Sequence, residues 1–164
     1  MSIQLSFSNR WNLSKTMVFE KCFHRNLRLS LSEKRALLKA SECVWLYDGR
    51  TRKLIGETYG TPVSYALRDV DEATEDIRRF KGLPAIYIYS VAILPRFRGR
   101  GLSKILTAYF LGQVARSGYK WIIAHSRVGA SCELYRAFGA RFLSTHRDWY
   151  GTGEVYRFWV LRLR

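Results

Sequence analysis

The chain has 164 residues, of which 48 % are hydrophobic, and this size and composition predict one domain, residues 1–164, with a packed core. No apolar run reaches the length that spans a membrane, and the N-terminus lacks the charged-then-apolar order of a secretory signal. Three cysteines without a CxxC pair argue against a disulfide framework and against a zinc site. We therefore expect a cytoplasmic protein, a monomer or homodimer, that binds neither a membrane nor a metal.

The formal net charge of +15 is concentrated in the second half of the chain. Residues 1–76 hold 12 basic and 10 acidic side chains, whereas residues 77–164 hold 16 basic and 3 acidic ones. Arginine outnumbers lysine 20 to 8, and the planar guanidinium fork suits phosphates and other anions. This excess favours an anionic ligand or partner, although a basic surface also serves solubility alone.

The first part of the sequence predicts a strand, two helices and a hairpin. Ser30 and Glu33 have the spacing of a capping box and open the second helix. Asp48 and Gly49 begin a turn between two apolar runs, a pattern that is typical of a hairpin. In chain order, the expected elements are a strand at 3–7, a helix of weaker periodicity at 14–27, a helix at 31–40, and strands at 43–48 and 53–59.

The segment 60–84 is less regular and carries an acidic run before a basic one. Arg78, Arg79 and Lys81 follow the acids and precede Gly82. A short helix with acids first and bases last matches its own dipole, and this explanation is favoured because it accounts for both charge signs. The alternative is an acidic patch for a basic substrate. The acidic residues are Asp69, Asp71, Glu72, Glu75 and Asp76.

The second part of the sequence alternates strands and helices. Residues 85–94 form a long β-branched and aromatic run, as a central strand does. An amphipathic helix is expected from Leu102 to Gly118, and Ser131 is expected to cap a helix that ends before Gly139. Together the elements predict an α/β domain around a mixed sheet. The remaining strands are expected at 120–126, 141–145 and 154–163.

A loop rich in arginine and glycine, residues 96–101, joins the strand 85–94 to the helix that begins at Leu102. The first N–H groups of a helix have no partners within it, and this end of the helix dipole is positive. Glycines let the backbone approach a ligand closely, and the arginines add positive charge. The loop therefore predicts a pyrophosphate site, although neither the P-loop nor the dinucleotide-binding glycine pattern is present.

This loop resembles the signature Gln/Arg-x-x-Gly-x-Gly/Ala of the GNAT superfamily, the Gcn5-related N-acetyltransferases. Arg96, Gly99 and Gly101 occupy its defined positions. The preceding Val91-Ala92-Ile93-x-Pro95 is similar to the end of the family's strand, and Leu134-Tyr135-x-x-x-Gly139 is similar to a second family motif. The resemblance covers most of the chain and is strongest from 85 to 145.

The resemblance implies the GNAT fold, a mixed, mostly antiparallel sheet of six or seven strands flanked by helices and splayed between strands 85–94 and 120–126. It also implies acetyl-CoA as the acyl donor, whose thioester would enter at the splay. The backbone of two strand residues would pair with the pantetheine arm, and N–H groups from Phe97 to Leu102, helped by Ser103, would hold the pyrophosphate. The implied donor-binding residues are Val91, Ile93, Arg96, Phe97, Arg98, Gly99, Arg100, Gly101, Leu102 and Ser103.

Direct acetyl transfer needs a base for the proton of the amine and an acid for the departing thiolate. Tyr135 falls on the family's tyrosine and is the candidate acid, with a buried core aromatic as the alternative. Ile123 stands where some relatives carry a glutamate. His125 lies two residues further on the same face and is the candidate base, with a structural histidine as the alternative. Glu57 on the hairpin is a second candidate, with a solvated strand residue as the alternative.

Two segments, 25–30 and 146–153, fall where relatives select the acceptor, and they mix aromatic side chains with arginine. Such a mixture could stack on bases or hold an anion, although ordinary loop packing also explains it. The first reading of the function is an N-acetyltransferase that acts on a primary amine of a protein or small molecule. The alternatives are a GNAT-fold enzyme that acts on nucleic acid, suggested by the charge, and a non-catalytic CoA-binding protein, suggested by the missing carboxylate.

Overall fold

The computed structural model describes residues 2–8, 13–71 and 74–163, which contain a seven-stranded sheet. Neighbouring strands pair antiparallel, except for β4 and β5, which run parallel. The mixed, mostly antiparallel sheet that was expected is thereby confirmed. In order across the sheet, the strands are β1 (Ile3–Phe7), β2 (Glu42–Asp48), β3 (Leu54–Pro62), β4 (Ala85–Ile93), β5 (Trp121–Arg127), β7 (Val155–Arg162) and β6 (Arg141–Arg147).

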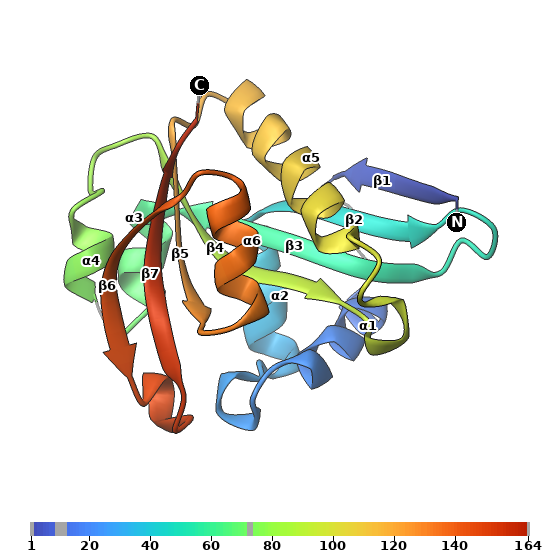
Figure 1. The fold of residues 1–164 in the computed structure, drawn as a ribbon, viewed down its shortest axis with the longest axis horizontal. Helices are drawn as coiled ribbons and strands as arrows, with labels where there is room; N and C mark the ends of the chain where they lie inside the picture. Colours follow the sequence, from blue (N-terminus) through green and yellow to red (C-terminus); the bar gives the residue numbers. More distant parts are fainter. Residues whose placement is uncertain (1, 9–12, 72–73, 164) are drawn as a thin grey trace.

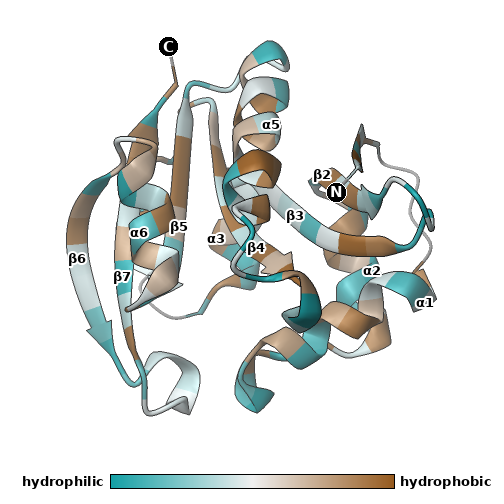
Figure 2. Ribbon diagram, turned by 45° about the vertical axis from the view of Figure 1, so that its right-hand side comes forward, coloured by the Kyte–Doolittle hydropathy of each residue, from teal (hydrophilic) through white to brown (hydrophobic). Residues whose placement is uncertain are grey.

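Helices cover both faces of the sheet (Figure 1). On one face, Leu106 and Phe110 of α5 share a core cluster with Tyr135 of α6 and with Ile122 of the apolar strand β5 (Figure 2). The helices α2, α3 and α4 cover the other face. Among the described residues, no helix is long and apolar enough to cross a membrane. The helices are α1 (Leu13–Thr16), α2 (Leu31–Lys39), α3 (Val63–Asp69), α4 (Thr74–Arg78), α5 (Leu102–Arg116) and α6 (Ala130–Ala137).

The strands β4 and β5 diverge in the middle of the sheet, as expected. Their pairing joins Ala85–Ile88 to Trp121–Ala124 and ends there, although β4 continues to Ile93 and β5 to Arg127. On its other side β4 stays paired with β3 as far as Ile93. The far half of β4 therefore presents an open backbone edge to the gap between the two strands (Figure 1).

Side chains of β4 alternate between the two faces of the sheet. Ile86 and Ile88 join the core under α5, whereas Tyr87 packs with the residues of α3 and α4. Tyr87 is in register with Ile123 of β5, and His125 lies two residues beyond Ile123 on the same face. Tyr87 and His125 are thus brought together where the paired part of the two strands ends.

The helix expected at 14–27 is wrong in form. After the four residues of α1, the chain makes 3-10 turns at Met17–Cys22 and Arg25–Leu27. Glu20 in this segment is buried, and its carboxylate accepts hydrogen bonds from Leu29 N and from Lys34 Nζ, both at 2.8 Å. Contacts to α2 and its preceding loop therefore hold this segment, in place of the hydrogen bonds of a regular helix.

The segment 60–84 is more ordered than expected. The strand β3 extends to Pro62, and two short helices, α3 and α4, stand where one was expected; Glu72 lies outside the described residues. In α4, Glu75 and Asp76 lie in the first turn and Arg78 in the last, so the dipole pattern is present. The buried side chain of Asp76 has further contacts, described below, that the helix dipole does not explain.

The helix ends follow the predicted signals with one exception. Ser30 Oγ accepts a hydrogen bond from Glu33 N at 3.3 Å, and the Glu33 carboxylate accepts one from Ser30 N at 2.7 Å, which completes the predicted capping box. Gly139 follows α6 with a φ of 76°, as expected for a helix stop. Ser131 is not the cap of α6, because the helix begins at Ala130, directly after Gly129 with its φ of 131°.

Candidate active site

A cleft of about 770 Å³ opens where β4 and β5 separate, a size within the usual range of ligand sites. The open end of β4, the start of α5, one side of α6 and the segments around 22–29 and 149–150 line it. Arg96, Arg100 and Glu57 are not among the lining residues. The predicted site residues that do line the cleft are Val91, Ile93, Phe97, Arg98, Gly99, Gly101, Leu102, Ser103, His125 and Tyr135.

The loop between β4 and α5 presents unused backbone amides. Gly99 and Gly101 have φ values of 74° and 71°, a left-handed conformation that glycine adopts without steric cost. Within the described part of the chain, no hydrogen bond uses the N–H groups of Gly99, Gly101, Leu102 or Ser103. Because α5 also lacks a side-chain cap, its positive N-terminus is available to an anion.

The expected series of amides needs one correction. Phe97 N donates to Leu94 O at 2.9 Å, and Arg98 N donates to Pro95 O at 3.1 Å, because these residues close a 3-10 turn. The available series therefore begins at Gly99 and not at Phe97. A Cβ added at Gly99 or Gly101 would meet no atom within 4 Å, so no neighbouring group packs against the Cα atoms of these two glycines.

The arginines of the loop surround it with charge. Arg96 and Arg100 place their guanidinium carbons 4.9 and 5.9 Å from the centroid of the Phe97 ring. Both arginines and Arg98 are exposed. Exposed charges act mainly by attracting an anion through solvent, so the backbone amides supply the fixed part of the site.

Val91 and Ile93 lie on the open edge of β4. Leu94 N donates to Ile55 O of β3, whereas the Ile93 carbonyl accepts a hydrogen bond from Arg98 Nε at 3.0 Å, outside the sheet. Backbone groups of alternate strand residues point the same way, so Val91 also faces the gap. Both residues are oriented to pair with an extended ligand, provided that Arg98 leaves the Ile93 carbonyl.

Tyr135 reaches the cleft from α6. Its side chain is buried, and its ring stacks on Trp159 with the centroids 6.2 Å apart. Burial raises the pKa of the Tyr135 phenol above its ordinary value, so the hydroxyl keeps its proton at neutral pH. A protonated phenol in the cleft suits a proton donor, while the stacking also satisfies the alternative of a core aromatic.

His125 is covered by aromatic neighbours. Its side chain is 1 % exposed, its ring stacks on Trp149 with the centroids 4.2 Å apart, and its Nδ1 lies 3.1 Å from the Tyr87 hydroxyl. Burial lowers the pKa of His125, and the nearby His146 lowers it further, against an opposing effect of Asp76. The imidazole is therefore neutral at neutral pH and can accept a proton. The sequence alone did not point to Tyr87 as a partner of His125, because their contact depends on the pairing of β4 with β5, which places Tyr87 in register with Ile123.

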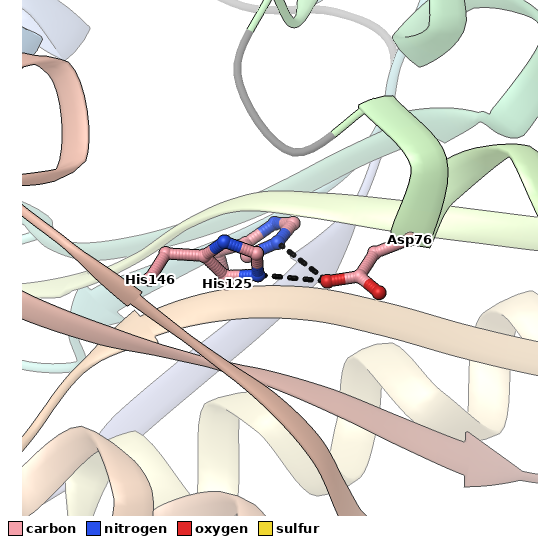
Figure 3. Close-up of side chains that lie close together, drawn as sticks. All are labelled: Asp76, His125 and His146. Atoms are coloured by element: carbon pink, nitrogen blue, oxygen red, sulfur yellow. Dashed lines mark hydrogen bonds and ion pairs between the residues drawn. The ribbon is translucent and has the colours of Figure 1, made fainter.

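His125 also belongs to a cluster with Asp76 and His146, which lie on the side of its Nε2 atom (Figure 3). Asp76 Oδ2 lies 2.7 Å from His146 Nε2 and 3.9 Å from His125 Nε2, and it accepts a hydrogen bond from Ser144 Oγ. Burial would raise the pKa of Asp76, but the contacts with His125, Ser144 and His146 outweigh it and hold the pKa below its ordinary value. Asp76 is therefore ionised at neutral pH.

The same cluster brings one carboxylate oxygen and two ring nitrogens within 4.8 Å of one another. These are donor types that zinc accepts, and the sequence argument against a metal considered only the cysteines. Yet Asp76 Oδ2 already accepts hydrogen bonds from both Ser144 and His146. The contacts present are those of a hydrogen-bonded network around a carboxylate.

Glu57 is fully buried and is not the solvated strand residue of the alternative reading. Its Oε1 lies 2.7 Å from Lys34 Nζ, which also contacts Glu20 at 2.8 Å. Burial raises the pKa of Glu57 to about 7, against the opposing effect of Lys34. Ser90, which does line the cleft, lies 3.4 Å from Glu57 Oε1, so Glu57 stands one side chain behind the cleft wall.

The two segments expected to select the acceptor meet at the mouth of the cleft. Asn26 Nδ2 donates to Tyr150 O at 3.2 Å and to Gly151 O at 2.7 Å. The Tyr150 hydroxyl in turn accepts from Asp71 N at 3.0 Å. Because Trp149 beside it is buried against His125, the β6–β7 connection is fixed on both sides.

Comparison with known proteins adds a family and a fold. The sequence profile of the acetyltransferase (GNAT) family matches residues 12–140. Among solved structures, the ribosomal-protein-S18-alanine N-acetyltransferase from Escherichia coli is similar, with 14 % identity, coverage of 99 % of this chain and 94 % of that one, and a TM-score of 0.76. A search of curated protein sequences finds no match.

Two similar structures were solved with the donor or its product. One is NAA60 of Arabidopsis thaliana in complex with acetyl-CoA, with 16 % identity, coverage of 99 % of each chain and a TM-score of 0.75. The other is an acetyltransferase of Bacillus subtilis in complex with CoA, with 12 % identity, coverage of 99 % and 100 %, and a TM-score of 0.72. The chain thus belongs to the acetyltransferase (GNAT) family and is an acetyl-CoA-dependent N-acetyltransferase.

Proposed function

We propose that this N-acetyltransferase passes the acetyl group directly to a primary amine that enters the cleft beside Tyr87 and Tyr135. Acetyl-CoA, when bound, supplies the activated acyl group as a thioester. The observation that carries the proposal is the set of backbone amides of Gly99, Gly101, Leu102 and Ser103, which no hydrogen bond among the described residues uses and which suit a diphosphate at the N-terminus of α5. Holding donor and acceptor in one cleft removes much of the entropic cost of their encounter.

The attacking amine must be neutral and must lose a proton as the new C–N bond forms. We assign this proton to His125, reached through the hydroxyl of Tyr87, because the imidazole is 1 % exposed and its Nδ1 lies 3.1 Å from that hydroxyl. Tyr87 passes its own proton to His125 Nδ1 as it takes one from the amine. Burial raises the pKa of Tyr87 well above its ordinary value, which favours such a concerted passage over a phenolate.

We assign Tyr135 to protonate the sulfur of the leaving group as the C–S bond breaks. Its phenol is kept protonated by burial, and its hydroxyl-bearing side chain lines the cleft. One turnover then leaves a proton on His125 and removes one from Tyr135, and exchange with solvent restores both. Glu57 has no part in this path, because it lies behind the cleft wall in an ion pair with Lys34.

The acceptor class that we favour is an amine of a protein or small molecule. The similar Escherichia coli enzyme is named for an alanine of a ribosomal protein, which supports a protein acceptor by analogy of fold. The second candidate is a nucleic acid, because the phosphates of CoA would use only about three or four positive charges, which leaves most of the net charge of +15 unexplained.

The direct test is mass spectrometry of amine panels, peptides and aminoacylated tRNA after incubation with isotope-labelled acetyl-CoA. The proposal predicts labelled acetyl on an amine and a matching release of CoA thiol. The variant Tyr87→Phe should bind CoA as the wild type does and lose most of the turnover. Tight CoA binding without transfer to any acceptor would instead support the non-catalytic reading.

A further inference from the structure

We propose that Asp76 is a positioning residue of the transfer reaction, which holds His125 in the one tautomer that can take a proton from Tyr87. The inference rests on the proposed role of His125 and extends the site to α4, outside the cleft.

The two ring nitrogens of His125 face different partners. Nδ1 lies 3.1 Å from the hydroxyl of Tyr87. On the other side of the ring, Nε2 faces Asp76 Oδ2 at 3.9 Å (Figure 3). Nε2 is buried and has no hydrogen-bond partner among the described residues. A lone pair on Nε2 would be repelled by the carboxylate, whereas an N–H there is attracted to it. The carboxylate therefore favours the Nε2–H tautomer, which leaves the Nδ1 lone pair to accept from Tyr87.

Asp76 also supplies the charge that a protonated His125 needs. An imidazolium buried among aromatic rings is costly unless an opposite charge faces it. The titratable and charged groups around the ring are Tyr87 from β4, His146 from β6, and Asp76 with its neighbour Arg79 from α4; Trp149 and Phe158 supply the remaining ring contacts. Asp76 is the one anion in this set.

The position of Asp76 is itself fixed. His146 Nε2 and Ser144 Oγ both contact the oxygen that faces His125. His146 is 25 % exposed at its side chain, so the network reaches from the covered imidazole to solvent. Asp76 thus stands between the reacting histidine and the outside, in the position of the buried acid in a hydrolase triad.

The test compares Asp76→Asn with Glu75→Gln. Both remove one carboxylate charge from α4, but Glu75 is exposed and pairs with Arg78. The pKa of His125 is measured by NMR titration of the three histidines, which His24→Gln and His146→Gln assign. We expect Asp76→Asn to lower this pKa by roughly one to three units, since a charge about 4 Å away contributes about 1 kcal/mol in bulk water and about 4 kcal/mol near a protein surface. A weaker base stays unprotonated to lower pH, so the acid limb of the pH profile of kcat/KM should shift to lower pH by a similar amount. The plateau value of kcat/KM should fall, because the weaker base accepts the proton less readily.

Four results would overturn the inference. They are an unchanged His125 pKa in Asp76→Asn, an equal change in Glu75→Gln, a changed pKa with an unmoved acid limb, and one zinc ion per chain whose removal by EDTA shifts the His125 signals. If Asp76→Asn does not fold, the nitrogen chemical shifts of the His125 ring in the wild type test the proposal. A dominant Nδ1–H tautomer would contradict it. Failure of the proposed function looks different, because the wild type itself would then transfer no acetyl group.

Discussion

Gly99→Glu is the sharpest perturbation of the donor site, and Gly99→Gln is its matched control. Both variants place a side chain at a φ of 74°, which costs roughly 1–2 kcal/mol of folding free energy in either case. Neither new Cβ clashes, because nothing lies within 4 Å of it. The two side chains have nearly the same volume, so the difference between the variants isolates the charge.

The expected size of that difference follows from Coulomb's law. A carboxylate about 4 Å from one phosphate charge is repelled by about 1 kcal/mol in bulk water and about 4 kcal/mol near a protein surface. The affinity for CoA should therefore be roughly 5- to 1,000-fold weaker in Gly99→Glu than in Gly99→Gln. Calorimetric titration with CoA measures the affinity of each variant. The difference between the two affinities should become smaller in high salt, because salt screens the repulsion. Equal affinities for CoA in two variants of equal thermal stability would refute the assignment of the diphosphate to this loop.

Three further predictions test other parts of the site. Tyr135→Phe should lower kcat by roughly 10²- to 10⁴-fold and spare CoA affinity, and a wild-type kcat would remove its role as the acid. Lys34→Met should lower the free energy of unfolding by about 3–5 kcal/mol, because it leaves Glu20 and Glu57 buried without a counter-charge. Urea unfolding measures this loss, Glu57→Gln should restore part of it in the double variant, and a change under 1 kcal/mol contradicts the ion-pair account. If nucleic acid is the acceptor, the logarithm of the binding constant of the protein for immobilised tRNA should fall steeply and linearly with the logarithm of the salt concentration. Weak binding that does not depend on salt favours an amine of a protein or small molecule as the acceptor.

The signals that predict a donor site are local. Arg96, Gly99 and Gly101 lie within six residues, and a strand and a helix on either side can be recognised by their periodicity. The splay between β4 and β5 was implied by the resemblance to the GNAT family and is present in the structure. What local spacing could not reveal is that the turn at Pro95 uses the amides of Phe97 and Arg98, since this depends on the backbone angles that the proline initiates.

The back of the site could not be predicted because its contacts join distant segments. Asp76 meets His146 only because β6 lies beside β7, and β7 beside β5. From the sequence alone, the dipole of a short helix was enough to explain an acidic residue at position 76. For Glu57 the sequence offers a candidate base or a solvated strand residue, because strand periodicity does not show that Lys34, on a separate helix, pairs with it. Each missed contact depends on tertiary packing and leaves no signal within its own element.

The account depends most directly on where the donor binds, and a crystal structure with CoA measures this. We expect the diphosphate against the amides from Gly99 to Ser103, the pantetheine arm along Val91 and Ile93, and the sulfur in the gap between β4 and β5 near Tyr135. A structure in which CoA lies elsewhere, with those amides unbound, would contradict the account.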